Sequence, residues 1–368
     1  MNFRMLIAVT AVCLIGAGKA TAAPVSINWV TVGDPGNFSG DEIATGSGPV
    51  SYGAVGYEYQ IGKYEVTNAQ YVEFLNAKAA SDPLALYNAN MASNGSGGII
   101  QNGVSGSFSY AVKPGHGNKP VNYVTFYDAA RFTNWMNNGQ GNADTESGAY
   151  TLVGGAATPT SPNSIVRTPG ATIVLPTVDE WFKAAYYDPT KPNAVDEADY
   201  WRYPTQSDSV SLITALPSST PHTANVRGTT FYGPDFGVGY AMTPGVGPPA
   251  IAAVDYLSDV GAYTGSASHY GTFDQAGNVI EWTQTWTMIT NPNGVRIVLG
   301  GSFSNDEYSA RYEGPAASTG TSGGIGSGFR LVNLSLEAEA VPEPSTGLLA
   351  ATAFGVVVFG LARRRRQG

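Results

Sequence analysis

Three segments of the chain combine a helix-capping signal with apolar residues at helical spacing. They cover residues 67–75, 125–135 and 177–185. In each, a threonine is followed three residues later by a side chain that accepts hydrogen bonds; the pairs are Thr67 with Gln70, Thr125 with Asp128, and Thr177 with Glu180. Because the two side chains satisfy each other's free backbone N–H groups, this capping box marks the first turn of a helix. The sequence therefore predicts three short helices.

Strand patterns lie between these helices. Runs rich in β-branched and aromatic residues, bounded by Gly, Pro or Asn, occupy residues 56–63, 172–175, 295–299 and 329–336. The stretches 92–106 and 154–170 are rich in Gly, Ser, Pro and Thr, which indicates surface loops. No repeat of fixed period occurs. A few short helices among strands and long loops indicate an α+β fold.

The N-terminus has the pattern of a secretory signal peptide over residues 1–23. Arg4 precedes an apolar run at 5–17, and the small residues Thr21 and Ala23 mark a cleavage position. The run is too short to cross a bilayer. The alternative is a buried first helix.

The C-terminus, residues 341–368, has three parts. Pro342-Glu343-Pro344 comes first, then an apolar stretch at 346–362, then four arginines at 363–366. About 17 apolar residues barely cross the hydrocarbon core, and arginines hold that end in the cytoplasm, so we expect a transmembrane helix. This order resembles the PEP-CTERM sorting signal of Gram-negative bacteria. The resemblance implies removal of the helix by an exosortase and release or attachment at the cell surface; a permanent single-span anchor is the alternative.

Composition describes the part between these ends, residues 24–340, which we expect to be one domain because no linker divides it. Without Arg4, Lys19 and the tail arginines, 13 basic residues face 27 acidic ones, because Glu343 also lies in the tail, which gives a net charge near −14. Binding of nucleic acid or anionic lipid is not expected of so acidic a domain. The only cysteine is Cys13, so no disulfide stabilises the mature chain. We expect a metal ion to hold the loops instead.

Six motifs in order resemble the formylglycine-generating enzyme (sulfatase-modifying factor) family. They are residues 61–74, 119–135, 175–181, 274–282, 300–303 and 328–331, which include Glu-Val-Thr-Asn, Lys-Pro-Val, Leu-Pro-Thr, Gly-Asn-Val-Ile-Glu-Trp, Gly-Gly-Ser and Gly-Phe-Arg. Together they span roughly residues 55–335. The resemblance implies a compact, C-type-lectin-like α+β fold with little regular secondary structure.

The catalytic chemistry of that family is not expected here. Aligning on the Gly-Gly-Ser motif places Asn305 and Ala310 at the two cysteine positions of the family, and neither side chain forms a thiolate or binds copper. The three histidines, His116, His222 and His269, lack metal-ligand spacing. A nucleophile-elbow spacing at 320–324 has no apolar strand before it. We therefore expect no catalytic residue and no copper; the alternative is an oxidase of the formylglycine-generating type or a non-haem-iron oxygenase.

Calcium is the cofactor that the resemblance implies. The matching family segment holds calcium through positions that correspond here to the side chains of Asp274 and Glu281 and the backbone oxygens of Gly277 and Val279. Calcium takes six to eight oxygen ligands of this kind. The alternative is that Asp274 caps a turn and Glu281 pairs with an arginine such as Arg330.

A second calcium site in the family begins with a segment that resembles Asn225 and Val226. Its aspartate is not identifiable, because residues 232–249 depart from the family pattern, and Asp235 is only a guess.

The function expected from these features is an exported cell-surface or extracellular-matrix protein that binds polysaccharide or protein. Its partners would be an exosortase during processing and an exopolysaccharide or surface protein afterwards. Aromatic residues in the loops could stack on sugars, or could equally belong to the core; they are Trp201, Tyr203, Phe231, Tyr232 and Tyr312.

Overall fold

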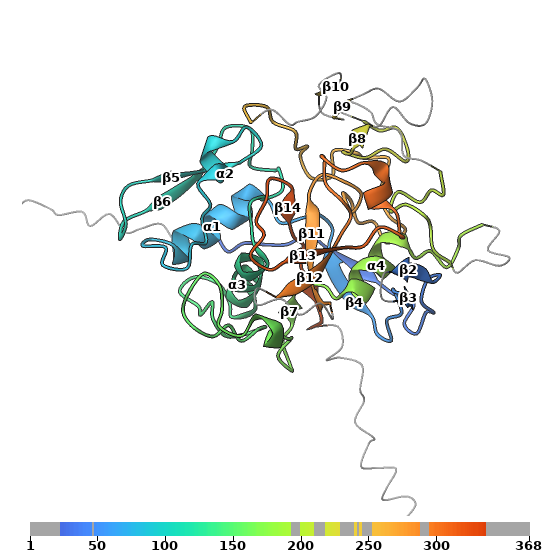
Figure 1. The fold of residues 1–368 in the computed structure, drawn as a ribbon, viewed down its shortest axis with the longest axis horizontal. Coiled ribbons are helices and arrows are strands. Elements are labelled where there is room, and N and C mark those ends of the chain that lie inside the picture. The colour runs from blue at the N-terminus through green and yellow to red at the C-terminus, as the bar shows by residue number, and fades with distance from the viewer. Residues whose placement is uncertain are drawn as a thin grey trace, which may run out of the picture.

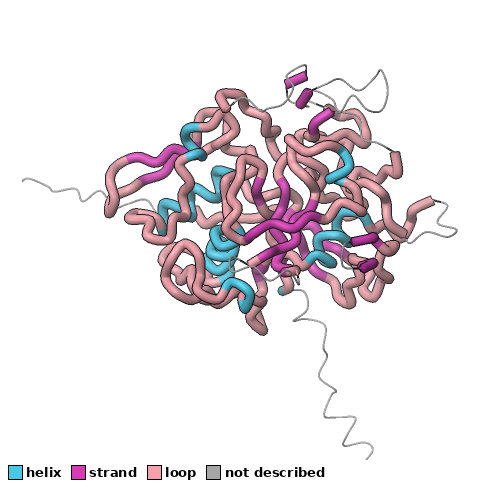
Figure 2. The backbone as a smooth tube through the Cα atoms, viewed as in Figure 1, coloured by secondary structure: helices cyan, strands magenta, loops and turns pink. Residues whose placement is uncertain are grey.

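A computed structural model describes residues 23–45, 48–192, 199–209, 218–228, 239–240, 243–244, 252–287 and 294–335. Its helices are α1 (Asn68–Lys78), α2 (Asn90–Ser93), α3 (Phe126–Asn137) and α4 (Val178–Tyr186), with two short 3-10 turns, η1 (Pro162–Ser164) and η3 (Glu307–Ala310). Most of the backbone between them is loop, as Figure 2 shows. The predicted low content of regular structure is confirmed.

The three capping boxes begin α1, α3 and α4. The hydroxyls of Thr67, Thr125 and Thr177 each accept a hydrogen bond from the backbone three residues on, and the return bond is present in all three. The predicted helices are therefore confirmed, and the aspartate of the α3 box serves as well as glutamate.

Two four-stranded sheets form the centre of the fold (Figure 1). The first has the order β1 (Trp29–Val32), β4 (Tyr59–Gly62), β15 (Val332–Asn333) and β7 (Ile173–Val174), all antiparallel. The second has the order β13 (Ala316–Thr319), β12 (Val295–Leu299), β11 (Ile280–Trp286) and β14 (Ser327–Gly328), with β14 parallel to β11. Each predicted strand run contains a strand, and β12 has the predicted bounds. Every residue of β12 is buried, which fits the apolar residues that make up all of the strand except the buried Arg296.

Smaller sheets lie at the periphery. They are β2 (Ile43–Thr45) with β3 (Gly48–Val50), β5 (Ile99–Asn102) with β6 (Ser109–Val112), and β8 (Arg227–Gly228) with β9 (Gly239–Tyr240) and β10 (Thr243–Pro244). The prediction of a loop over residues 92–106 is wrong in part, because β5 lies inside it. Glycines dominated that stretch, but Ile99 and Ile100 pair with the later strand β6, which a local composition does not include.

Aromatic side chains fill the core between α1, α3 and the first sheet. The ring of Phe74 lies 5.4 Å from those of Tyr71, Phe132 and Trp135, and Phe132 lies 5.4 Å from Phe329. A second cluster surrounds α4, on the other side of the second sheet in Figure 1. Edge-to-face contacts of this kind stabilise beyond the area they bury.

The expected signal peptide, PEP-CTERM signal and transmembrane helix at 346–362 lie outside the described residues, except for position 23. Within the described ranges, no helix combines the length and the apolar character needed to cross a membrane.

Candidate metal centre

A buried ion pair lies where the two sheets meet. Glu281 on β11 and Arg330, just before β15, are both fully buried. Arg330 donates two hydrogen bonds of 2.6 Å to the carboxylate of Glu281, one to each oxygen. The indole N–H of Trp181 on α4 donates a third, of 2.7 Å, to Oε2. Of the two interpretations of Glu281 in the sequence, pairing with Arg330 is present in the structure.

Arg330 also connects this pair to neighbouring loops. Its guanidinium donates to the carbonyls of Gly62 at 3.0 Å and Phe273 at 2.8 Å. The N–H of Phe273 donates to Lys63 O at 2.9 Å. These bonds hold the segment after β4 against the start of the 274–282 motif.

The loop from Asp274 to Asn278 has an unusual backbone. Asp274, Gly277 and Asn278 have φ values of +62°, +82° and +55°, in the left-handed region. A Cβ at Gly277 would lie 2.2 Å from the carbonyl oxygen of Asn225, so only glycine fits there. This close approach joins the two segments in which the resemblance places calcium ligands.

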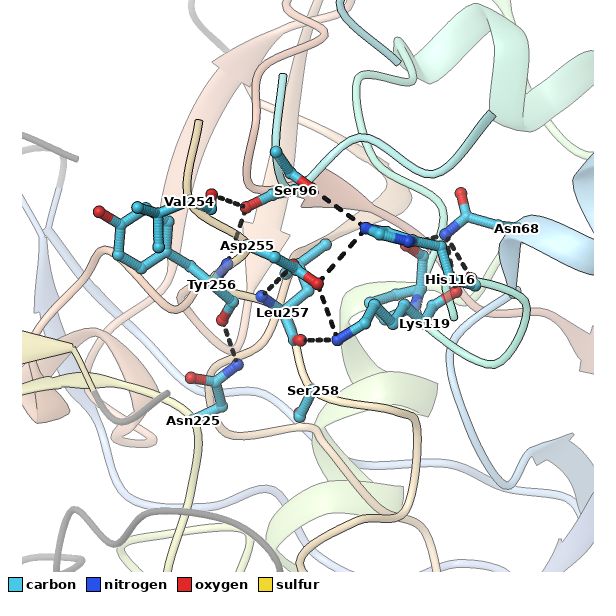
Figure 3. A network of polar contacts seen from close by, with 12 residues as sticks. Asn68, Ser96, His116, Lys119, Asn225, Val254, Asp255, Tyr256, Leu257 and Ser258 are labelled. Atoms are coloured by element: carbon cyan, nitrogen blue, oxygen red, sulfur yellow. Dashed lines mark hydrogen bonds and ion pairs between the residues drawn. The ribbon is translucent and has the colours of Figure 1, made fainter. Parts of the chain in front are cut away.

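Asn225 is fixed by this contact. Its amide donates to Tyr256 O at 2.9 Å and to Asn278 Oδ1 at 3.0 Å, as Figure 3 shows for Tyr256. The side-chain oxygen of Asn225 is buried and has no hydrogen-bond partner. Val226 is buried beside it.

Asp255 directly precedes Tyr256, whose carbonyl accepts from Asn225. The sequence analysis did not identify this carboxylate. Oδ2 of Asp255 forms an ion pair with Nζ of Lys119 at 3.0 Å and lies 3.4 Å from Nε2 of His116 (Figure 3). The same ammonium of Lys119 donates to Leu257 O. Asp235, the earlier guess, lies outside the described residues.

A further carboxylate, Glu65, faces Asp274. Glu65 is 2% exposed, and no N–H or hydroxyl group of the described residues donates to its carboxyl. The carboxyl of Asp274 interacts with that of Glu65 at hydrogen-bonding range, and Asp274 Oδ2 also accepts from the N–H of Gly261 at 2.6 Å. The sequence analysis did not identify Glu65. Its position between the end of β4 and the N-cap of α1 at Thr67 could have indicated a buried acidic residue.

Burial raises the pKa of Glu65 well above its usual range, and the neighbouring charge of Asp274 raises it further. Burial likewise raises the pKa of Asp274 to about 6. Three carboxylates, Glu65, Asp274 and Glu281, thus interact with one guanidinium, so the cluster has two negative charges in excess when all four groups are ionised. Excess buried charge is costly unless a cation or a proton neutralises it.

Calcium fits this arrangement of charges. When all four groups are ionised, a divalent cation matches the excess, and carboxylate oxygens are hard ligands of the kind calcium prefers. Among the described residues, no three His, Cys, Asp or Glu side chains gather closely enough to hold an ion by themselves. A cation here therefore also needs backbone carbonyls, such as those expected at Gly277 and Val279.

Asn305 and Ala310, which the resemblance aligns with the family's cysteines, lie in and after a turn. The side-chain oxygen of Asn305 accepts from the N–H of Ser302 at 3.0 Å and from its hydroxyl at 2.7 Å, which closes a turn. Ala310 is buried at the end of η3. Asn305 and Ala310 thus have structural contacts.

The three histidines lie apart, each with its own partner. His116 faces Asp255, His222 faces the carbonyl of Thr205, and His269 lies 2.9 Å from Asp188.

The aromatic candidates divide into groups. Tyr203 is buried, which makes it a core residue, and Lys191 lies over the ring of Trp201 at 5.1 Å. Tyr312 lines a surface hollow of about 440 Å³; the other lining residues are Asp41, Lys191, Tyr200, Arg202, Asp208 and Glu313. Tyr200 also borders a neighbouring hollow with the exposed Phe38. Phe231 and Tyr232 lie outside the described residues.

Comparison with solved structures supports the fold. The chain is similar to the crystal structure of CarF, with a TM-score of 0.50 and 20% identity over 84% of this chain and 98% of that one. It is also similar to Treponema denticola variable protein 1, with a TM-score of 0.45 and 16% identity over 85% and 97% of the two chains. PvdO from Pseudomonas aeruginosa has a TM-score of 0.38 and 13% identity over 84% of this chain and 92% of that one.

No curated protein matches the chain. Residues 20–334 match the family described as the sulfatase-modifying factor enzyme 1-like domain. This match covers most of the chain and includes all six motifs. The chain therefore belongs to the sulfatase-modifying factor enzyme 1-like (FGE-sulfatase) family.

Proposed function

We propose that this protein is an exported, non-catalytic member of its family that binds polysaccharide at the cell surface or in the extracellular matrix. The signal-peptide pattern and the Pro-Glu-Pro, apolar, arginine order of the tail support export and processing by an exosortase. The acidic composition supports a partner other than nucleic acid.

The contacts of Asn305 carry the non-catalytic part of the proposal. The amide oxygen of Asn305 binds the hydroxyl and N–H of Ser302, so the position that carries a cysteine in the family closes a turn here. Neither Asn305 nor Ala310 exchanges disulfides or forms a thiolate. Assay of cysteine-to-formylglycine conversion in a substrate peptide tests this, and turnover by the purified protein would overturn it.

Calcium is proposed as the stabilising cofactor. Asp274, the carbonyls of Gly277 and Val279, and the charge of Glu281 would surround one ion. Its two positive charges would offset the two negative charges that the cluster has in excess when its carboxyls are ionised. The partnerless buried oxygen of Asn225, beside Val226, supports a second ion. At 100 times its dissociation constant, a ligand adds about 2.7 kcal/mol to the free energy of unfolding. A melting temperature that is the same in calcium and in chelator would contradict this proposal.

The hollow lined by Tyr312 and Tyr200 is the proposed polysaccharide site. The partly exposed ring of Tyr312 supplies a flat apolar face, the buried Tyr200 forms the floor beside it, and the surrounding carboxylates and basic groups supply hydrogen bonds for sugar hydroxyls.

Binding of the producing bacterium's exopolysaccharide to the wild type and to Tyr312→Ala tests the site. We expect about a tenfold loss of affinity, equal to about 1.4 kcal/mol. Tyr308→Ala is the matched control, because Tyr308 is exposed and does not line the hollow. If both variants bind equally well, the hollow is not the polysaccharide site. If the wild type does not bind, the proposed polysaccharide-binding function is refuted.

A further inference from the structure

We propose that the hollow lined by Tyr312 continues across Tyr200 to Phe38, and that the two hollows together, here called the extended groove, bind a polysaccharide of amino sugars with free, protonated amino groups. This specificity rests on the polysaccharide binding proposed above and gives the chemical class of the polysaccharide.

Two hollows meet at Tyr200, which lines both. The one that contains Tyr312 has a volume of about 440 Å³. The other has a volume of about 450 Å³, and its lining includes Phe38, Tyr187 and Asp199. Each volume is in the range of ligand sites in proteins. A polymer that occupies the first hollow can therefore continue over Tyr200 into the second.

Phe38 presents an aromatic ring to solvent from a fixed loop. Its side chain is 89% exposed, the highest value among the large apolar side chains of the described residues. The N–H of Gly36 donates to Val55 O at 2.8 Å. The N–H of Gly40, on the other side of Phe38, donates to Tyr52 O at 2.9 Å. Because the loop is anchored on both sides, little conformational entropy is lost when a sugar ring stacks on Phe38.

The side chain of Asn37 fastens this loop to the floor of the extended groove. Its amide donates to the hydroxyl of Tyr200 and to Gly53 O, both at 2.8 Å. The hydroxyl of Tyr200 in turn donates to Phe38 O at 3.0 Å. The aromatic residues of the two hollows are therefore parts of one hydrogen-bonded unit, and their spacing is set before a ligand arrives.

The basic side chains that line the extended groove already have carboxylate partners. Lys191 forms an ion pair of 3.1 Å with Asp208, and its side chain is 5% exposed. Arg202 forms an ion pair of 3.3 Å with Glu313. An acidic polysaccharide would therefore compete with an existing carboxylate for each cation.

Three further carboxylates line the extended groove. Asp41 is exposed and Asp199 is partly exposed, and no Lys, Arg or His side chain of the described residues forms an ion pair with either. The third, Asp34, accepts from the hydroxyl of Tyr270 at 2.9 Å, and the ammonium of the buried Lys183 donates to its carbonyl. Negative charge is thus in excess, which attracts cationic ligands and repels anionic ones.

Amino sugars match both properties of the extended groove. The apolar face of a sugar ring can stack on Phe38 and Tyr312. A protonated amino group supplies a positive charge and N–H donors to Asp41 and Asp199. A neutral polysaccharide would make only the stacking contacts. A basic peptide would meet the carboxylates but has no flat saturated rings at a regular spacing for the aromatic residues.

The test measures binding of three oligosaccharides of equal length to the full-length protein by titration calorimetry. They are a chitosan oligomer with free amino groups, the same oligomer with every amino group acetylated, and an oligogalacturonate, which is acidic. A mildly acidic buffer keeps the amines protonated and exposed aspartates ionised. Polylysine is the control for attraction by charge alone.

Two groove variants are compared with two variants outside it. The groove variants are Phe38→Ala and Asp199→Asn. Val104→Ala removes an apolar side chain that is 70% exposed, and Glu58→Gln removes an exposed charge. Neither Val104 nor Glu58 lines either hollow.

We expect the wild type to bind the chitosan oligomer at least about tenfold more tightly than the other two oligosaccharides. Phe38→Ala should weaken binding of the chitosan and acetylated oligomers alike, by about five- to tenfold. Asp199→Asn should weaken only the chitosan complex, by about three- to fivefold. Added salt should reduce the preference for chitosan, and both control variants should match the wild type.

Other results separate the two proposals. If the acetylated oligomer binds as tightly as the chitosan oligomer, the amino-sugar specificity is refuted and polysaccharide binding stands. The same holds if the protein binds the exopolysaccharide of its own bacterium but none of the three oligomers. If polylysine binds as tightly as chitosan and Phe38→Ala weakens neither, the surface attracts positive charge only and the inference fails. If no polysaccharide binds, both proposals fail.

Discussion

Replacing Arg330 with methionine removes the basic partner of Glu281 among the described residues. Methionine is of comparable length but has no charge and no N–H groups. The variant leaves a fully buried carboxylate with Trp181 as its remaining donor, and it also leaves the carbonyls of Gly62 and Phe273 without this donor. Breaking a buried ion pair from one side typically costs about 3–5 kcal/mol. This is a large part of a total stability of roughly 5–15 kcal/mol.

Urea unfolding followed by tryptophan fluorescence measures this loss. We expect a free energy of unfolding about 3–5 kcal/mol lower than that of the wild type, and in a thermal scan a melting temperature roughly 6–15 °C lower. Arg202→Met is the matched control, because Arg202 is 41% exposed and its bond to Glu313 is 3.3 Å long, so a loss of about 0–1 kcal/mol is expected. If Arg330→Met costs no more than this control, the reasoning about the buried pair is refuted.

Calcium provides a second measurement on the same variant. Without Arg330, the cluster of Glu65, Asp274 and Glu281 has no basic group to offset its carboxylates, and it has three negative charges in excess when all three are ionised. The stabilisation by calcium should therefore be larger in Arg330→Met than in the wild type. A smaller calcium effect would mean that Arg330 helps to build the site.

Three further variants test the fold around this centre. Gly277→Ala should lower the free energy of unfolding in a guanidinium titration by more than about 2 kcal/mol. About 1–2 kcal/mol of this comes from its φ of +82°, and the rest from the close approach to Asn225 O. Gly36 has a similar φ but lies in open space, so Gly36→Ala should show only the cost of the positive φ. Asp128→Asn tests a carboxyl whose pKa burial raises to about 7. The stability that this carboxyl contributes is fully present below about pH 4 and is lost as the pH rises through 7. The difference in melting temperature between pH 5 and pH 8 should therefore be smaller in the variant than in the wild type. An equal difference in both proteins would contradict the raised pKa of Asp128. Thr177→Ala should lower the free energy of unfolding by about 1 kcal/mol through loss of the α4 cap, whereas Thr177→Ser should be near neutral; equal losses would refute the capping role.

The polar centre could be predicted only in part. The motif that contains Asp274 and Glu281 was visible in the sequence, and so was the alternative that Glu281 pairs with Arg330. The other two contacts were not visible, because Trp181 lies 100 positions from Glu281 in the chain and Glu65 lies far from Asp274. No local pattern states that a carboxylate after β4 and one before β11 share a buried space.

Prediction succeeded for features with a local cause. A threonine and an acceptor three residues later begin a helix by bonds within a single turn, so α1, α3 and α4 followed from the sequence. The buried run of β12 was equally clear. Strand β5 was missed because its partner β6 lies outside the glycine-rich stretch that surrounds it.

The sequence alone thus determined the family, the helix starts, the main strands and the absence of cysteine from the two positions now held by Asn305 and Ala310. Only the tertiary structure decided which charges meet. Arg330 reaches Glu281 across adjacent strands of the fold, and the carboxyl of Glu65 is left facing that of Asp274. The physical reason is range: capping and strand patterns act over a few residues, whereas the energy of a buried charge depends on every group that folding brings near it.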